Sequence, residues 1–261
     1  MTLPFLSLEQ IELFLLVFFR TMGIIAASPP FGNKSIPNQQ KVALSILVSL
    51  ILLPLVPTTG FTAATEMLPL MVMVFKEVMV GLIIGFVARL LFMAVEMAGQ
   101  MVGVALGFSI VNVFDPTQGT QVPIVSQLYG IMAILIFLAT GAYQWFFQGL
   151  MDSFSLIPIA GMVFSGGLMD FMIRASAESF VIAIKLSAPV LATMVFVDII
   201  QGVMARTVPQ MNIFIVGYPL KIGMGLLILG LSLTFFTEYF IAQLQVLRED
   251  FYIVMKAMGK G

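Results

Sequence analysis

Residues 68–96, LPLMVMVFKEVMVGLIIGFVARLLFMAVE, decide the fold class of this chain. The run is apolar along nearly its whole length and exceeds the roughly 20 residues that a helix needs to cross a bilayer. The composition agrees, because 60% of the 261 residues are hydrophobic, 10% are charged and the mean hydropathy is +1.10. In a typical soluble domain about a quarter of all residues are charged. The sequence therefore predicts an integral membrane protein.

Similar apolar runs lie on both sides of this one, and about six approach the length of a crossing. They cover residues 11–28, 41–57, 68–96, 124–150, 171–201 and 212–246. A shorter apolar segment, 97–114, leads into a polar loop, and the connections between runs are short. We therefore expect an all-α membrane protein of about six long hydrophobic helices plus a short broken segment, with no soluble domain in these connections.

Composition also limits the chemistry of the chain. A net charge of −1 gives no electrostatic reason to expect a nucleic-acid partner. The lack of Cys and His removes thiol chemistry, Cys/His zinc sites and histidine acid–base catalysis. The segment GNKS at 32–35 lacks the glycine spacing of a phosphate-binding loop. We expect no enzyme activity, no cofactor and no metal site.

The basic residues near the runs give no consistent orientation in the membrane. Lys34 and Lys41 favour a cytoplasmic first loop, yet six crossings would then place the basic C-terminal tail outside. Counting 97–114 as a further crossing places the basic C-terminal tail in the cytoplasm, but it also places Arg206 and Lys221 outside. Either some helices do not cross a bilayer in the ordinary way, or the few charges give noisy statistics.

Several ionisable side chains lie inside the apolar runs, where insertion costs roughly 2.5–3.5 kcal/mol each. They are Lys76, Glu77, Arg89, Glu96, Arg174, Glu178 and Lys185. Their spacing places Arg89 with Glu96, and Arg174 with Glu178, on shared helix faces. They could form a proton or ion path. We favour ion pairs between helices or subunits, because both signs are balanced and no histidine relay exists.

Two further features concern helix shape and packing. Arg206 and Gln210 lie near Pro209 in a predicted polar turn between the last two runs, and Pro189 should kink the helix before it. Small residues spaced four apart let another backbone approach closely. Such spacing occurs at Gly81, Gly85, Gly99, Gly103 and Gly107.

The last of these glycines begins the segment GFSIVNVFDPTQGTQVP, residues 107–123. Asp115-Pro116 favours a turn, and the amides and hydroxyls after it suit a wet environment. Non-helical backbone at membrane depth is tolerated only where it is buried in protein or lines a water-filled cavity. Apolar side chains such as Phe108 and Phe114 could close an aqueous passage there. A plain surface loop between two helices is the alternative.

Four stretches together resemble the FliR/SctR subunit of the bacterial type III secretion export gate, and the flagellar branch is the nearer one. They are SPPFGNKSIPNQQK (28–41), KEVMVGLIIGFVARLLFMAVEMAGQMVGVALGFS (76–109), VFDP (113–116) and ARTVPQMNIFIVGYPLKIGMGL (205–226). The resemblance runs along nearly the whole chain. It implies one copy of this subunit, in the bacterial inner membrane within the flagellar basal body.

The resemblance further implies that helical hairpins of this subunit pack with P-type and Q-type subunits into a hetero-oligomeric gate. Residues 1–190 would correspond to the P-like part and 191–261 to the Q-like hairpin and tail. A B-type switch protein and an A-type export protein are the other implied partners, with unfolded flagellar proteins as cargo.

In that family a loop of this subunit plugs the pore, and it maps here onto residues 107–121. The implied plug residues are Phe108, Ile110, Val111, Asn112, Val113, Phe114, Asp115, Pro116 and Gln118. The family has Phe at the positions of Ile110 and Val113, whereas this chain has Phe108 and Phe114, so the resemblance leaves open which side chains form the seal. The predicted function is a pore-forming export-gate subunit. The alternatives are a proton- or ion-coupled small-solute transporter, for which we find no second broken helix, and a structural scaffold.

Overall fold

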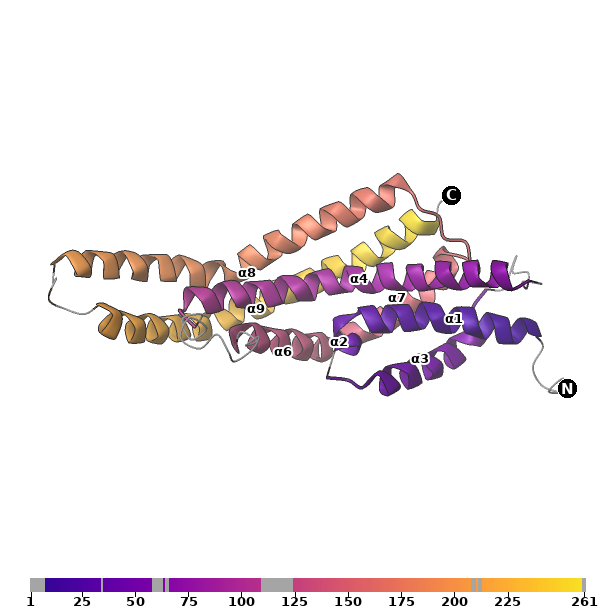
Figure 1. The fold of residues 1–261 in the computed structure, drawn as a ribbon, viewed down its shortest axis with the longest axis horizontal. Helices are drawn as coiled ribbons and strands as arrows, with labels where there is room; N and C mark the ends of the chain where they lie inside the picture. Colours follow the sequence, from indigo (N-terminus) through magenta and orange to yellow (C-terminus); the bar gives the residue numbers. More distant parts are fainter. Residues whose placement is uncertain are drawn as a thin grey trace. The chain divides into compact units, whose positions relative to one another are not determined.

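The structure, a computed structural model, describes residues 8–33, 35–57, 63, 66–108, 124–207, 210 and 213–259. The regular elements in these ranges are all helices, and they are shown in Figure 1. They are α1 (Leu8–Ala27), α2 (Pro29–Gly32), α3 (Asn38–Leu52), η1 (Leu53–Leu55), α4 (Met67–Ala105), α6 (Ile124–Ala139), α7 (Ala142–Leu156), α8 (Gly166–Thr207) and α9 (Ile213–Gly259). The predicted all-α fold class is confirmed.

The helices have the length and apolarity that membrane crossings need. Five candidates meet this requirement among the described residues, namely α1, α3 continued by η1, α4, α8 and α9. A sixth arises if α6 and α7, which bend by 75° at a short break, form one span. The break lies inside the run 124–150 that the sequence predicted as one helix. Gly141 adopts a φ of +70° there, a left-handed conformation that ends the helical path.

The chain divides into two compact units. Unit 1 comprises the described residues of Met1–Leu90, Gly141–Ser176 and Leu244–Gly261, and unit 2 those of Leu91–Thr140 and Ala177–Gln243. The predicted P-like and Q-like parts meet at residue 190, which lies inside α8. That division stays a prediction.

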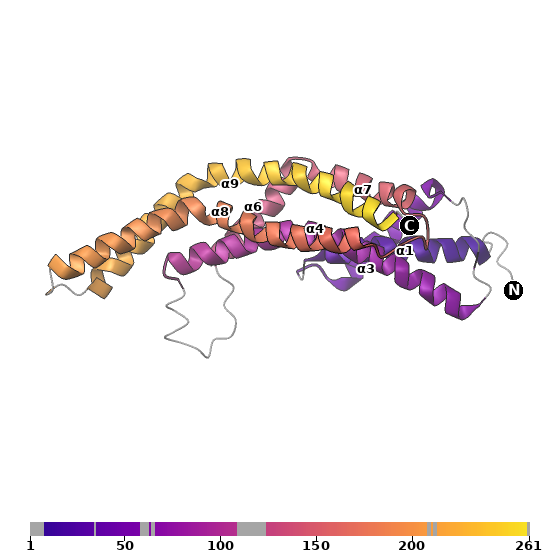
Figure 2. The ribbon, with the colours of Figure 1, turned by 90° about the horizontal axis from the view of Figure 1, so that it is seen from above.

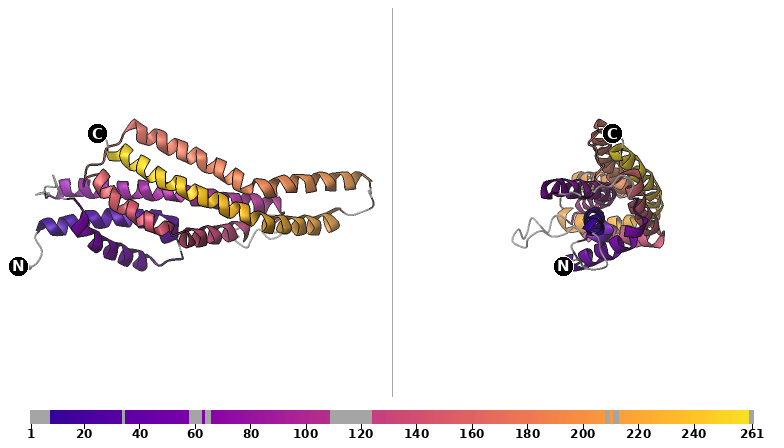
Figure 3. Two further views of the ribbon diagram at one scale, coloured as in Figure 1. Left: turned by 180° about the vertical axis from the view of Figure 1, so that it is seen from behind. Right: turned by 90° about the vertical axis from the view of Figure 1, so that its right-hand side faces the viewer.

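In unit 1, α7 lies beside the last turns of α9, as Figure 3 shows. The contact is aromatic: the ring centroid of Phe251 lies 5.7 Å from those of Trp145 and Phe146. On another side of the unit, α3 turns its serines inward against α1. The hydroxyl of Ser45 is buried and lies 3.4 Å from the sulfur of Met22. Small and aromatic residues thus let the helices of this unit pack closely.

In unit 2, α8 and α9 form a helical hairpin that is visible in Figure 2. The side-chain amide of Gln201 donates to the carbonyl of Gly217 at 2.9 Å and joins the two helices. The interior contains a second aromatic cluster. Its members are Phe92, Tyr129, Phe137, Phe236 and Phe240, with ring centroids 4.6–6.1 Å apart in the contacting pairs.

Both units also expose many large apolar side chains. In unit 2 these include Phe196, Ile199 and Leu231, which are 66%, 57% and 71% exposed. A water-soluble protein rarely leaves such side chains uncovered in contiguous patches. Lipid or other protein chains must therefore cover these helices.

Candidate functional site

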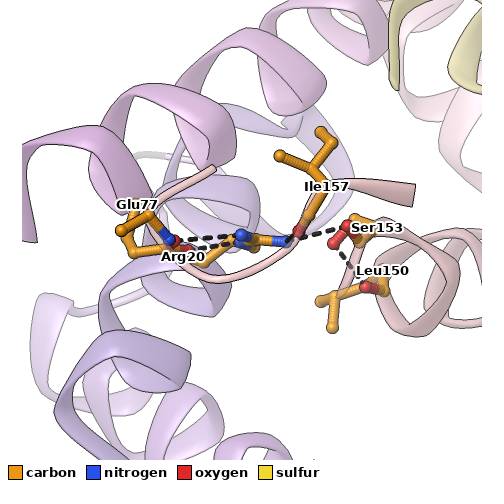
Figure 4. A network of polar contacts seen from close by, with 6 residues as sticks. Arg20, Glu77, Leu150, Ser153 and Ile157 are labelled. Carbon is orange, nitrogen blue, oxygen red and sulfur yellow. Dashed lines mark hydrogen bonds and ion pairs between the residues drawn. The ribbon is translucent and has the colours of Figure 1, made fainter. Parts of the chain in front are cut away.

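A buried ion pair joins α1 to α4 in unit 1. Arg20 and Glu77 have side chains that are 0% and 1% exposed. The guanidinium contacts the carboxylate twice, with Nε 2.5 Å from Oε2 and Nη2 3.0 Å from Oε1 (Figure 4). Two parallel contacts of this kind are the strongest arrangement that arginine and a carboxylate can form. Each charge thus neutralises the other in a region that water does not reach.

The remaining donor of Arg20 points at the end of α7. Its Nη1 donates to the carbonyl of Ser153 at 2.8 Å and to the carbonyl of Ile157 at 3.0 Å (Figure 4). The Ser153 carbonyl also accepts the N–H of Ile157 at 3.0 Å, and the C-terminal end of a helix carries partial negative charge, so a cation is favoured there. The ring of Phe154 adds a cation–π contact, 4.3 Å from the guanidinium carbon to the ring centroid.

Glu77 and its neighbour Lys76 together hold the turn that follows α7. The backbone N–H of Ala160 donates to Oε1 of Glu77 at 2.7 Å, and Nζ of Lys76 donates to the carbonyl of Ala160 at 3.0 Å. Ala160 has a φ of +57°, which is uncommon for a residue with a side chain. These contacts compensate for the strain of that conformation. Val163, just beyond the turn, donates its N–H to the carbonyl of Met258 in α9 at 3.0 Å.

We call this arrangement the Arg20 network: Arg20, Lys76, Glu77, and the backbone groups of Ser153, Ile157 and Ala160. It joins α1, α4, α7 and the turn before α8. Lys76 and Glu77 were among the charged residues predicted to pair inside the apolar runs, but Arg20 was not. The available signal was a lone arginine in the middle of the apolar run 11–28.

The glycines of α4 lie where other helices approach most closely. A Cβ placed on Gly81 would overlap the carbonyl oxygen of Arg20 and lie 3.0 Å from Cα of Gly23. A Cβ on Gly85 would lie 2.5 Å from Cβ of Ala27, also in α1. In unit 2, a Cβ on Gly99 would overlap the backbone of Ser126 in α6. The Ser126 hydroxyl donates to the carbonyl of Glu96 at 2.9 Å.

Gly103 and Gly107, the last two of the five glycines singled out in the sequence, mark the end of α4. Gly107 has a φ of +86°, and its N–H donates to the carbonyl of Val104 at 3.0 Å. The N–H of Phe108 donates to the carbonyl of Gly103 at 3.2 Å. This pair of bonds is a Schellman motif, in which a left-handed glycine ends the helix and satisfies its last carbonyls. α4 therefore continues through the first half of the predicted segment 97–114 and ends at Ala105, just before Gly107.

The predicted polar pairs do not form ion pairs within their own helices. Arg89, Glu96, Arg174, Glu178 and Lys185 are all exposed, and no ion pair joins any two of these five residues. Arg206 and Gln210 are exposed as well. Lys221 instead pairs with Asp198 at 2.5 Å between α9 and α8, and that carboxylate is about half exposed. A role for the five in contacts with other subunits stays a prediction.

Comparison with known proteins supplies the family. The family model described as "Bacterial export proteins, family 1" matches residues 11–247. The chain belongs to this family of bacterial export proteins. The resemblance to FliR/SctR drawn from the sequence is confirmed by this match together with the flagellar FliR proteins that are similar to the chain.

Individual relatives match over most of their length. The flagellar biosynthetic protein FliR of Bacillus subtilis (strain 168) is 34% identical over 219 residues, 83% of this chain and 84% of the relative. The FliR proteins of Pectobacterium carotovorum subsp. carotovorum and Aquifex aeolicus (strain VF5) are each 29% identical. The first covers 83% of this chain and 82% of the relative, and the second 88% and 89%.

Most of the plug residues predicted from the resemblance lie outside the described residues. These are Ile110, Val111, Asn112, Val113, Phe114, Asp115, Pro116 and Gln118. Gly107 and Phe108 are described, directly after α4, and Gly107 lies near the ring of Tyr218. Across the described ranges, no group of three or more acidic side chains is placed to hold a metal ion.

Proposed function

We propose that this chain is the pore-forming core subunit of a flagellar protein export gate and passes unfolded flagellar proteins outward. The match of the export-protein family to residues 11–247 carries this proposal, together with the FliR names of the relatives. The apolar helices fit a protein that works in a membrane, and we propose the bacterial inner membrane within the flagellar basal body.

The proposed gate contains other subunits. The exposed apolar side chains of α8 and α9 need a cover, and neighbouring helices of P-type and Q-type subunits would supply it. In this proposal residues 1–190 act as the P-like part and 191–261 as the Q-like hairpin. A B-type switch protein and an A-type export protein complete the set of partners. The exposed charges of α4 and α8 would pair with groups of those partners.

The loop 107–121 is the proposed plug. The Schellman motif at Gly107 ends α4 and releases the chain into this loop, which returns to a helix at Ile124. In the resting gate its apolar residues block the channel, and export displaces them. The Arg20 network would hold α1, α4 and α7 of unit 1 in fixed positions relative to one another while the loop moves. We propose no catalytic role, so the energy for export must come from another component.

Export by cells is the direct test of this role. A flagellated host that lacks its own copy of the gene should stop releasing flagellar proteins into the medium, and expression of this chain with its matching gate subunits should restore release. Release unchanged by loss of the gene would contradict the proposal. The rival, an ion-coupled small-solute transporter, predicts solute uptake by the purified chain alone in liposomes, which the export-gate proposal does not.

A further inference from the structure

Inside unit 2 the end of α4 lies against the hairpin of α8 and α9. Leu106, the first residue after α4, has a fully buried side chain that is 0% exposed. A Cβ placed on Gly225 of α9 would overlap Cδ2 of Leu106 and would lie 3.4 Å from the sulfur of Met194 in α8. Leu106 therefore occupies the space that a side chain at position 225 would need, and only a glycine there leaves room for it. We call Leu106, Met194 and Gly225 the Leu106 seat.

The next residue along the chain contacts the same helix of the hairpin. A Cβ placed on Gly107 would lie 3.4 Å from Cε1 of the Tyr218 ring in α9. The N–H of Leu106 donates to the carbonyl of Val102 at 2.9 Å, so its backbone also continues the hydrogen bonding of α4. Leu106 and Gly107 are thus held by α4 on one side and by the hairpin on the other, at the point where the segment 107–121 begins.

The two helices of the hairpin are tied to each other close to the seat. Lys221 pairs with Asp198 about one turn away from the seat along α9. The side-chain amide of Gln201 donates to the carbonyl of Gly217, about two turns away. Protein interiors are close-packed and leave few voids, so a movement of this hairpin must carry Leu106 with it.

We propose that the Leu106 seat ties the start of the loop 107–121 to the α8–α9 hairpin, so that the position of the hairpin sets whether the loop blocks the channel. This inference rests on the proposed function, since it takes the loop as the plug. Export displaces the plug by moving the hairpin, which pulls on residue 106. If the seat were ordinary core packing, changes in it would lower stability or assembly and would leave the assembled gate tight.

The leak of small ions across the membrane of cells that express the chain with its partner subunits tests the proposal. Gly225→Val places carbon atoms where Cδ2 of Leu106 lies and should push Leu106 out of the seat. We expect the leak to rise to the level that deletion of residues 108–118 gives, while co-purification shows that the complex is still assembled. Gly225→Ala adds less bulk at the same overlap and takes its place if the valine variant does not assemble.

Two further variants make the test specific to the seat. Leu106→Ala combined with Gly225→Val removes as many carbon atoms from the seat as it adds, so it should restore the tightness of the unaltered chain. Gly223→Val is the matched control on the same helix. A Cβ on Gly223 meets nothing within 4 Å, so this variant should leave the membrane tight.

Several results would overturn the proposal. They are a tight membrane with an assembled Gly225 variant, an equal leak with Gly223→Val, a leak that persists in the double variant, and loss of assembly in both Gly225 variants. Deletion of residues 108–118 in the same cells separates failure of the seat from failure of the proposed function. If the deletion leaks and the seat variants do not, the plug stands and the seat is wrong. If the deletion does not leak, the proposed plug fails as well.

Discussion

Arg20 is the residue that most clearly ties distant parts of the chain together. Its partner Glu77 lies 57 residues away, and the carbonyls that it contacts belong to residues 153 and 157. The sequence indicates that Lys76 and Glu77 need partners, because charges inside apolar runs are costly. The partners themselves could not be predicted, because the pairing depends on how α1, α4 and α7 pack rather than on local spacing.

Removing one member of the buried pair should be strongly destabilising. Arg20→Ala leaves the carboxylate of Glu77 buried without a counter-charge, and we expect it to lower the free energy of unfolding by about 3–5 kcal/mol. The measurement is an SDS titration of the purified chain in mixed micelles. The double variant Arg20→Met with Glu77→Leu should recover much of the loss, because it leaves no unpaired charge at that site.

A surface pair is the matched control. Lys221→Met removes the contact with Asp198, whose carboxylate is about half exposed, and should cost at most about 1 kcal/mol. Equal losses for Arg20→Ala and Lys221→Met would show that burial does not decide the strength of these pairs.

Two glycines inside helices should respond in opposite ways to replacement by alanine, which adds one methyl group. Gly81→Ala forces α4 away from the backbone of α1 and should cost about 1–3 kcal/mol. Gly202→Ala, on the exposed side of α8 with nothing within 4 Å, should instead stabilise the chain by about 0.5–1 kcal/mol. The same SDS titration measures both. A stabilising Gly81→Ala would mean that α1 and α4 are not in close contact.

At the scale of elements, sequence periodicity located the helices but not all of their ends. The predicted boundary between 96 and 97 is absent, because nothing in that segment breaks the helix before Gly107. The break between α6 and α7 was missed for the opposite reason. Thr140 and Gly141 lie within a mostly apolar run, and only the left-handed conformation of Gly141 reveals the bend. Whether a single glycine ends a helix depends on the backbone angles that it adopts, and composition does not specify those angles.

The last turns of α9 contribute to the core of unit 1. Met255 and Met258 are fully buried there, whereas Ile253 is 52% exposed. Met258→Ala should therefore lower the free energy of unfolding by about 2–5 kcal/mol. Ile253→Ala on the same helix should change it by less than about 1 kcal/mol in detergent. SDS titration of the two variants side by side checks this, and similar losses would mean that the end of α9 does not pack as described.

At the scale of the whole molecule, the sequence predicted the fold class and the family, and both are confirmed. Four stretches carried the resemblance to the family, because their specific residues match it in the family's order and the match does not depend on hydrophobicity alone. The candidate site was predicted less completely. The glycine positions and Glu77 were named, whereas the anchoring of the turn at Ala160 depends on backbone groups that no side-chain pattern reports.

The proposed gate makes one claim that a single measurement addresses, namely that the loop after α4 closes a pore. The measurement is the leak of small ions across the membrane of cells that express the chain, with residues 108–118 deleted, together with its partner subunits. Cells with the unaltered chain are the control, and co-purification shows whether the assembly persists. We predict that the leak rises while the complex stays assembled. Tight membranes with an intact complex would contradict the account.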